Sequence, residues 1–339
     1  MREGIAYAGN LIVDRIRRID RLPRRSELAA IHGTSRSAGG ACNGAVILKR
    51  LAPQMPVSVC GAVGEDGEGD FILGHLAQNG IDTRGVLRRG ETSFTDVYEE
   101  SSTNCRTFFY FGGANDSFDA EDIDCAALTC RMLQICYPLL LPALDAPHAQ
   151  YGTRMGLLLH RAREAGCLTA LDVVSEESSR YETLVRPLLE ETDYLTVNEL
   201  EAERITGVRL TDADGALMEE NMRPALETML ALGVSRRAII HAPSAAFGMD
   251  ADGTFAHEMG KRLPDGFIRG TVGAGDAFCA GALLAAYRGL PVAQALRFGN
   301  AAAVQSLRAD TSCGAVVSME ECLVHYDALP YRRSGAQKE

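Results

Sequence analysis

Apolar and polar stretches alternate along this chain in a way that predicts strands and helices in turn. In the second half, short runs rich in β-branched residues predict strands at 132–137, 168–174, 194–197 and 238–241. Segments with helical spacing are found at 152–165, 181–190, 199–206, 219–232, 292–307 and 319–326. This rhythm predicts a mostly parallel sheet with helices on both faces, where ligands bind beyond the carboxyl ends of the strands.

The N-terminal part follows the same pattern with one interruption. Its predicted strands and helices lie at 5–13, 39–51, 56–63 and 70–79. Two segments, about 15–37 and 91–112, differ in kind: the first is basic and polar, and the second contains two strand-like runs. They predict a small sheet inserted into one domain at 1–330, and the remainder, 331–339, is expected to be loose.

The second strand of that small sheet is apolar on both faces. Phe108 and Tyr110 point to one side, while Phe109 and Phe111 point to the other. A strand of this kind has to be covered on both sides. An extra layer on a single core is the alternative to a separate inserted sheet.

Composition narrows the class of protein. The 339 residues are 46% hydrophobic and 23% charged, which is typical of a globular protein. The net charge of −11 argues against nucleic acid as a partner, since that binding rests on basic surface. No apolar run is long enough to span a membrane. The start of the chain lacks the apolar core of a secretion signal, so we expect a cytoplasmic protein whose ten cysteines are reduced.

The chemically most informative stretch is Thr271-Val272-Gly273-Ala274-Gly275-Asp276, which precedes an apolar run at 277–287. The glycines predict a tight turn leading into a buried helix. Unpaired amides and the helix dipole at such an N-terminus favour an anion. An Asp beside a bound phosphate suggests removal of a proton from an attacking hydroxyl. A glycine turn with an acidic cap is the alternative.

This stretch, TVGAGDAFCAGAL, resembles the C-terminal signature of the ribokinase-like (phosphofructokinase-B) carbohydrate kinases. Other parts of the family signature occur in the same order: Asp14 at the end of the first predicted strand, Gly39-Gly40 with Asn43 at the start of a helix, and Asn198-Glu199-Leu200-Glu201 as Asn-x-x-Glu. The resemblance covers about residues 4–325. It implies an α/β fold in which the small sheet is a lid over a sugar, with an outer face that often meets a second subunit. We therefore expect a homodimer.

The resemblance also implies a reaction, the transfer of the γ-phosphoryl group of ATP to a hydroxyl of a sugar or sugar-like molecule. It implies that Asp276 is the catalytic base and that the amides around Gly273, Ala274 and Gly275 stabilise the transferring group. The residues implied to hold the sugar are Asp14, Gly39, Gly40 and Asn43. Those implied to serve the nucleotide are Asn198 and Glu201, which would organise Mg²⁺ (Glu201 through water), and Asn300, which would contact the adenine.

For the Asn-x-x-Glu motif the residues alone offer a simpler explanation. Asn198 and Glu201 follow directly on a predicted strand and have the spacing of a capped helix start. They also share one face of the first helical turn. Mg²⁺ keeps several waters and takes few protein ligands, so one carboxylate and one amide would suffice for an ion site.

Two segments depart from the family pattern. Pro243 and Ala246 stand where the family has glycines near the ATP phosphates, and proline offers no amide donor. The Asp that helps relatives hold a monovalent cation is Gly270 here, and the segment 308–314 looks longer than the matching loop, with Asp310 as a possible substitute ligand. A nucleoside kinase, or a sugar-binding homologue with weak phosphoryl transfer, therefore stays open as an alternative.

Two further features have ordinary explanations. His241 ends a predicted strand near the proposed site, and we expect it to be packed rather than catalytic. Arginines crowd residues 15–25, where they solvate the edge of the lid or, alternatively, steer a negatively charged acceptor.

Overall fold

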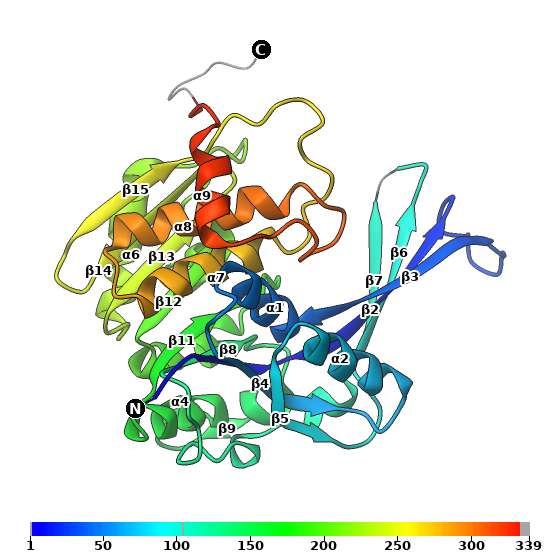
Figure 1. The fold of residues 1–339 in the computed structure, drawn as a ribbon, viewed down its shortest axis with the longest axis horizontal. Coiled ribbons are helices and arrows are strands. Elements are labelled where there is room, and N and C mark those ends of the chain that lie inside the picture. Colours follow the sequence, from blue (N-terminus) through cyan, green and yellow to red (C-terminus); the bar gives the residue numbers. More distant parts are fainter. Residues whose placement is uncertain (1, 104, 333–339) are drawn as a thin grey trace.

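A nine-stranded sheet forms the centre of the protein, whose computed structural model describes residues 2–103 and 105–332 (Figure 1). Its strands, in spatial order, are β15 (Phe255–Met259), β14 (Ala245–Asp250), β13 (Arg237–His241), β12 (Tyr194–Asn198), β11 (Leu168–Asp172), β8 (Met132–Cys136), β1 (Ile5–Gly9), β4 (Val57–Val63) and β5 (Asp82–Arg88). Neighbours from β13 to β5 are parallel, and β14 and β15 extend one edge in antiparallel fashion.

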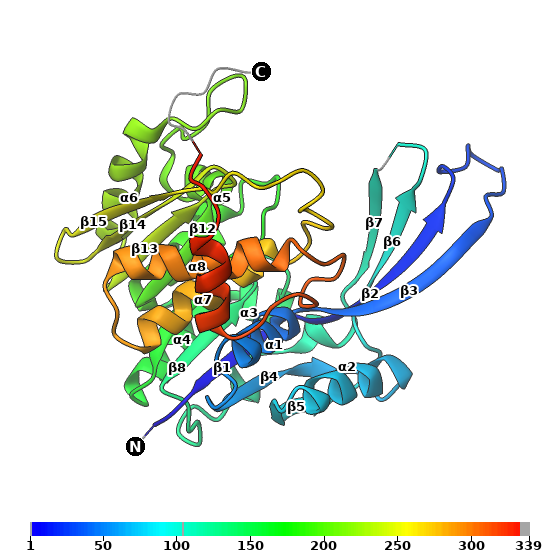
Figure 2. The same ribbon diagram turned by 45° about the horizontal axis from the view of Figure 1, so that its top comes forward.

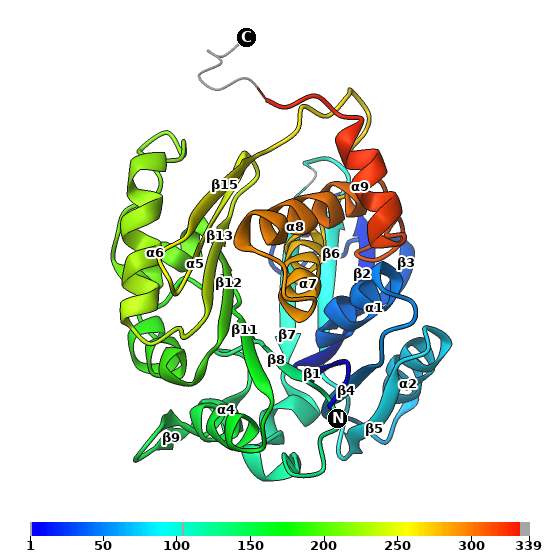
Figure 3. The same ribbon diagram turned by 60° about the vertical axis from the view of Figure 1, so that its left-hand side comes forward.

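Helices cover both faces of this sheet, as Figure 3 shows. One face carries α1 (Ala41–Leu51), α2 (Gly67–Gln78), α7 (Ala274–Tyr287), α8 (Val292–Ser306) and α9 (Met319–Asp327). The other carries α3 (Pro142–Asp145), α4 (Arg154–Glu164), α5 (Glu199–Thr206) and α6 (Met222–Ala231). Along β1, Ile5 and Tyr7 belong to the first apolar cluster, while Ala6 and Ala8 belong to the second. A strand apolar on both sides is what a parallel sheet between two helical layers requires.

Short elements connect these layers. They are the helical turns η1 (Gly113–Ser117), η2 (Ala120–Asp122), η3 (Tyr181–Val185), η4 (Arg186–Glu191) and η5 (Glu219–Asn221), and the two-stranded ribbon β9 (Pro147–His148) and β10 (Gly152–Thr153). The single helix predicted at 181–190 is wrong, because η3 is a π-helical turn and η4 a 3₁₀ helix. Pro187 lies at their junction and has no amide to continue an α-helical ladder.

A second, four-stranded sheet projects from the body as the lid (Figure 2). Its order is β3 (Ile31–Gly40), β2 (Leu11–Ile19), β6 (Phe94–Glu100) and β7 (Arg106–Phe111). The predicted inserted sheet is therefore present.

The predicted strand 5–13 is in fact two strands, which corrects the position of Asp14. The chain leaves the central sheet at Asn10, whose amide donates to the carbonyl of Cys136 at 2.7 Å. Asp14 therefore lies within lid strand β2, and not at the carboxyl end of a central strand. The chain returns from the lid to the body at Gly40. This residue has a φ of 66° and lies so close to the Asn10 carbonyl that there is no space for a side chain. Helix α1 accordingly begins at Ala41 instead of Gly39.

At the C-terminal end, the ordered contacts continue slightly past the predicted boundary at residue 330. Tyr331 pairs with Lys261 in an antiparallel bridge, and the Arg332 amide donates to the carbonyl of Gly260 at 3.0 Å. The rest of the predicted loose segment, 333–339, lies outside the described residues.

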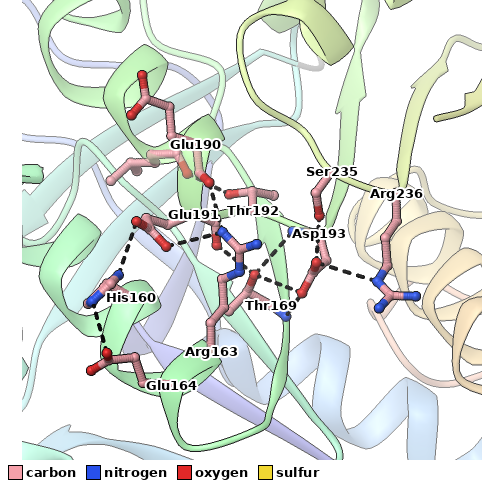
Figure 4. A network of polar contacts seen from close by, with 11 residues as sticks. His160, Arg163, Glu164, Thr169, Glu190, Glu191, Thr192, Asp193, Ser235 and Arg236 are labelled. Carbon is pink, nitrogen blue, oxygen red and sulfur yellow. Dashed lines mark hydrogen bonds and ion pairs between the residues drawn. The ribbon is translucent and has the colours of Figure 1, made fainter.

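The amino ends of the central strands are tied together by polar side chains (Figure 4). Asp193, 5% exposed, accepts hydrogen bonds from the Thr169 amide at 2.9 Å and the Ser235 hydroxyl at 2.6 Å. It also lies 3.4 Å from Arg236. One buried carboxylate thus joins the starts of β11, β12 and β13, and its partners identify it as a structural group.

Removing this carboxylate is expected to destabilise the fold without changing the contacts at the carboxyl ends of the strands. Asp193→Ala should lower the free energy of unfolding by about 2–3 kcal/mol, because it leaves buried donors without an acceptor. Urea unfolding followed by circular dichroism measures this. Glu164→Ala, which removes an exposed partner of His160, is the control and should change stability by less than about 0.5 kcal/mol. Equal stabilities of the two variants would contradict this role of Asp193.

Candidate active site

The predicted glycine turn opens helix α7 at the carboxyl edge of the sheet. Gly273 is the N-cap residue, with φ 80° in the left-handed region, and no side chain caps the helix. A Cβ at Gly273 would lie 2.8 Å from the Cα of Ser312, so this position excludes a side chain on both counts. The first turn of α7 therefore directs the positive end of the helix dipole and the amide of Gly275 toward an anion, while the Ala274 amide donates to the Thr271 carbonyl at 3.3 Å.

Asp276 lies in this first turn and does not cap the helix. Its Oδ2 accepts a hydrogen bond from Asn43 Nδ2 at 3.0 Å, and its Oδ1 accepts one from the hydroxyl of Tyr137, directly after β8. Burial raises the pKa of Asp276, while the hydrogen bonds from Tyr137 and Asn43 lower it. The carboxylate is held from two sides next to the anion-binding turn, which is the arrangement a positioned base requires.

The lid brings Asp14 to the same place. Asp14 pairs across the lid with Ser37 and Thr95, and a Cβ at Gly39 would lie 3.0 Å from its Oδ2. Burial and the charge of Asp276 raise the pKa of Asp14 to about 6. Gly40 and Asn43 follow directly at the start of α1, so the predicted sugar residues do come together beside Asp276.

Asn198 and Glu201 form the capped helix start that their spacing predicts. The Glu201 amide donates to Asn198 Oδ1 and the Asn198 amide donates to Glu201 Oε2, both at 2.9 Å. Glu201 Oε1 also accepts from the Ser175 hydroxyl at 2.7 Å. Glu201 is 4% exposed, and burial raises its pKa to about 7. Because its oxygens are already engaged, a metal ion would be reached through water, as Mg²⁺ commonly is.

Asp172 connects these two parts of the site, and the motifs did not single it out. It ends β11 and is 8% exposed. Burial first, and then the charges of Asp276 and Glu201, raise its pKa well above the ordinary value. The predicted strand at 168–174 placed Asp172 inside the strand, whereas β11 ends at this residue. Tyr137 and Ser312 likewise belong to no motif.

Asn300 lies in α8 and is 9% exposed. Its Nδ2 is buried without a hydrogen-bond partner in the structure. A buried donor left unpaired is costly, so a ligand acceptor is its natural complement. This fits the predicted contact with a nucleotide base.

The departures from the family pattern have local explanations. Pro243 lies in a short turn closed by the Ala242 amide and the Ala245 carbonyl at 2.9 Å, and Ala246 is buried inside β14. His241 stacks on the ring of Phe278 with centroids 4.7 Å apart. Burial lowers the pKa of His241 to about 4, so it is a neutral packed side chain.

Gly270 packs against the loop at 308–314. A Cβ at this position would lie 2.8 Å from the Ala309 carbonyl oxygen and 3.1 Å from the Cα of Asp310. The space next to Gly270 that a carboxylate would need is therefore already filled by backbone.

Arg15 and Arg17, the arginines of β2 closest to Asp14 in sequence, point away from it, whereas Arg18 and Arg106 lie on the Asp14 face and pair with Glu99. Side chains alternate along a strand, so Arg15 and Arg17 lie on the opposite face of β2 from Asp14. Arg15 pairs with Glu68 at 3.1 Å and Arg17 with Asp96 at 3.0 Å. Their charges are offset by acidic partners and do not face the candidate sugar pocket.

An uncapped helix start facing a held carboxylate is suited to transferring a charged group onto a hydroxyl, and this sheet with its lid defines a ribokinase-like small-molecule kinase. The chain belongs to the pfkB family of carbohydrate kinases, whose family model matches residues 2–316. It is thus a phosphotransferase with an alcohol group as acceptor, as the motifs predicted.

Individual relatives are distant but match along almost the whole chain. A ribokinase from Haemophilus influenzae is 24% identical over 95% of this chain and 98% of its own. The structure of Arabidopsis thaliana ribokinase complexed with ribose and ATP has a TM-score of 0.78 at 21% identity, covering 96% of this chain and 98% of that one. A nucleoside kinase from Methanocaldococcus jannaschii has a TM-score of 0.74 at 17% identity, with the same coverage.

The described part of the chain contains neither a membrane-spanning helix nor a cluster of metal-ligating side chains. Within 2–103 and 105–332, no helix is long and apolar enough to cross a membrane. The same residues contain no group of three or more His, Cys, Asp or Glu side chains arranged to hold a metal ion.

Proposed function

We propose that this protein transfers the γ-phosphoryl group of ATP to a hydroxyl of a neutral sugar or sugar-like polyol. The observation that carries the proposal is the position of Asp276, which is held by Asn43 and Tyr137 in the first turn of a helix that no side chain caps. Base and anion site are then adjacent. The orientation of Arg15 and Arg17 away from Asp14 supports an uncharged acceptor.

In the proposed reaction, Asp276 takes the proton of the acceptor hydroxyl. The hydroxyl oxygen bonds to the γ-phosphorus of ATP, and the bond from this phosphorus to the leaving ADP breaks. The amides of Gly273 to Gly275 stabilise negative charge on the transferring group. Asp14 accepts hydrogen bonds from neighbouring sugar hydroxyls. Gly39 and Gly40 let the backbone approach the sugar, and Asn43, beyond its bonds to Asp276 and Ser312, has a second amide hydrogen to donate.

The residues present fit ATP with Mg²⁺. The unpaired Nδ2 of Asn300 would donate to the adenine, and the start of α7 would receive the phosphates. Asn198 and Glu201 would orient the ion through water. When bound, Mg²⁺ would neutralise phosphate charge during transfer. The lid would exclude water, which otherwise competes with the sugar as acceptor.

A substrate panel tests this proposal against its rivals. The protein is incubated with ATP, Mg²⁺ and single sugars, polyols or nucleosides, and ADP formation is followed alongside the phosphorylated product by ³¹P NMR. We expect a phosphorylated neutral sugar or polyol. A phosphorylated nucleoside as the best product would identify a nucleoside kinase instead. Sugar binding in calorimetry without product would identify a homologue with weak transfer.

We further propose a homodimer formed through the lid. The side chains of β7 are exposed on both faces, with Phe109 56% and Phe108 62% accessible. Tyr110 contacts the body through the Leu140 carbonyl at 3.4 Å, which orients the Phe108 face toward the site. The Phe109 face is then left for a second copy.

Light scattering at micromolar concentration is expected to give the mass of a dimer. Phe109→Asp should shift the population toward monomer, because a charge would be buried in an apolar contact. Val324→Asp is the control, since Val324 is 69% exposed on α9 and lies outside the lid. A monomeric unaltered protein would contradict the dimer.

Potassium is not expected to activate the enzyme. Gly270 has no side chain to ligate an ion, and the 309–310 backbone fills the space beside it. Turnover should therefore be equal in K⁺ and in a bulky organic cation at the same ionic strength. Saturable activation by K⁺ of several-fold would overturn this prediction, and Asp310→Ala would then identify the substitute ligand.

A further inference from the structure

The loop at 308–314, between α8 and α9, lies directly behind the catalytic turn. Its Ser312 and Cys313 are 7% and 8% exposed, and the Cα of Ser312 would lie 2.8 Å from a Cβ placed on Gly273. Arg50, at the end of α1, donates a hydrogen bond to the carbonyl of Cys313. The loop is therefore fixed between α1 and the turn that opens α7.

A chain of hydrogen bonds runs from this loop to the catalytic carboxylate. The Ser312 hydroxyl donates to Asn43 Oδ1 at 2.9 Å, and Asn43 Nδ2 donates to Asp276 Oδ2 at 3.0 Å. The oxygen and the NH₂ group of an amide lie in one plane and point to opposite sides of the Cβ–Cγ bond. Satisfying Oδ1 from the loop therefore holds Nδ2 toward Asp276. Turned the other way, the amide would place an oxygen against the carboxylate.

The surroundings of Asp276 make this donor important. The charge of Asp276 raises the pKa of acidic groups on several elements: Tyr7 on β1, Asp14 on β2, Cys136 on β8, Asp172 on β11, Cys279 on α7 and Cys313 in the loop. None of these can supply positive charge. The groups that favour the ionised form of Asp276 are the two hydrogen-bond donors, Tyr137 and Asn43.

We propose that Ser312 is a positioning residue for phosphoryl transfer, which holds the Asn43 amide in the orientation that donates to Asp276 and aims its carboxylate at the acceptor. The proposal rests on the proposed function through the role of Asp276 as base. Ser312 touches neither the acceptor nor the phosphate and acts through Asn43. The loop thereby becomes part of the catalytic apparatus although it carries none of the family motifs.

The first test needs no turnover. Aspartate labelled with ¹³C at the side-chain carboxyl allows the titration of Asp276 to be followed by NMR, with Asp276→Asn identifying its signal. In Ser312→Ala the pKa of Asp276 should rise, because Asn43 Oδ1 keeps only the weaker contact with the Cys313 thiol at 3.8 Å. Ser306→Ala is the control: it removes a 2% exposed serine whose hydroxyl donates to Ala303 at 2.8 Å within α8. An unchanged Asp276 titration in Ser312→Ala would overturn the proposal.

The second test is a double-mutant cycle in turnover. Ser312→Ala should lower kcat about tenfold, the order expected for one buried hydrogen bond, and should move the acid limb of the pH profile upward. A proton-accepting base works only when ionised, so a higher pKa shifts its loss of activity to higher pH. In an Asn43→Ala background the same substitution should change kcat little. Equal losses in both backgrounds would show a packing role only and overturn the proposal.

Further variants keep the two proposals separate. Ser312→Cys retains a similar volume with a weaker donor and should lie between the unaltered protein and Ser312→Ala, which decides the matter if the alanine variant folds poorly. A protein that phosphorylates nothing in the substrate panel refutes the proposed function, while the NMR titration still decides the role of Ser312. An active enzyme that is indifferent to Ser312→Ala refutes the role of Ser312 alone.

Discussion

Asp276→Asn is expected to lose about 10²–10⁴ in turnover, the usual contribution of a positioned base. The substitution keeps the shape of the side chain and still leaves one oxygen for Asn43 or Tyr137. It removes the ability to take a proton and weakens one of the two hydrogen bonds that hold the side chain. Steady-state kinetics with the best acceptor from the panel measures the loss, and calorimetry should show ATP binding close to that of the unaltered protein.

Asp252→Asn is a suitable control for this experiment. Asp252 accepts a hydrogen bond from the Thr254 amide at 2.9 Å in the turn between β14 and β15, away from the candidate site. Its asparagine variant should keep full turnover. Retention of most activity by Asp276→Asn would refute the assignment of the base, whereas parallel losses in both variants would indicate a general effect on folding.

Gly273→Ala is expected to have the next largest effect, a loss of about hundredfold in kcat, since a displacement of about 1 Å in a reacting geometry has that consequence. Gly273 has φ 80°, and a Cβ there would lie 2.8 Å from the Cα of Ser312. Backbone cannot move aside as a flexible side chain can. The catalytic turn and the 308–314 loop would have to separate, taking the anion-binding amides with them.

The control for Gly273→Ala isolates backbone strain from this steric conflict. Gly207, at the end of α5, has φ 74°, and a Cβ there would meet nothing within 4 Å. Gly207→Ala should cost about 1 kcal/mol in stability and leave kcat unchanged. If both variants keep their activity, the close fit between Gly273 and the loop has no bearing on catalysis.

Several features of this protein could be predicted from its sequence because they depend on neighbours along the chain. The turn before α7, the capped start of α5 at Asn198 and the strand–helix rhythm are local patterns, in which caps, glycines and apolar periodicity act over a few residues. The family and fold that these motifs indicated are confirmed. The roles of the individual site residues remain proposals.

Some strands and strand boundaries could not be predicted because the local sequence pattern was ambiguous. The run at 5–13 is apolar except at Gly9 and Asn10, and this short interruption was too weak to indicate that the chain passes there from the central sheet to the lid. Strands β5, β14 and β15 were missed as well. β5 and β15 are the two edge strands and are partly exposed, with few of the continuous apolar residues by which central strands are recognised, and β14 lies next to β15.

The surroundings of Asp276 show where local information ends. The sequence by itself determined that a carboxylate follows a glycine turn at a helix start, since those residues are adjacent. Only the tertiary structure decided that Tyr137, Asn43 and Ser312 hold this carboxylate, because they come from the end of β8, the first turn of α1 and the loop before α9. Contacts between such distant residues depend on how the helices pack on the sheet, and this packing is a property of the whole core.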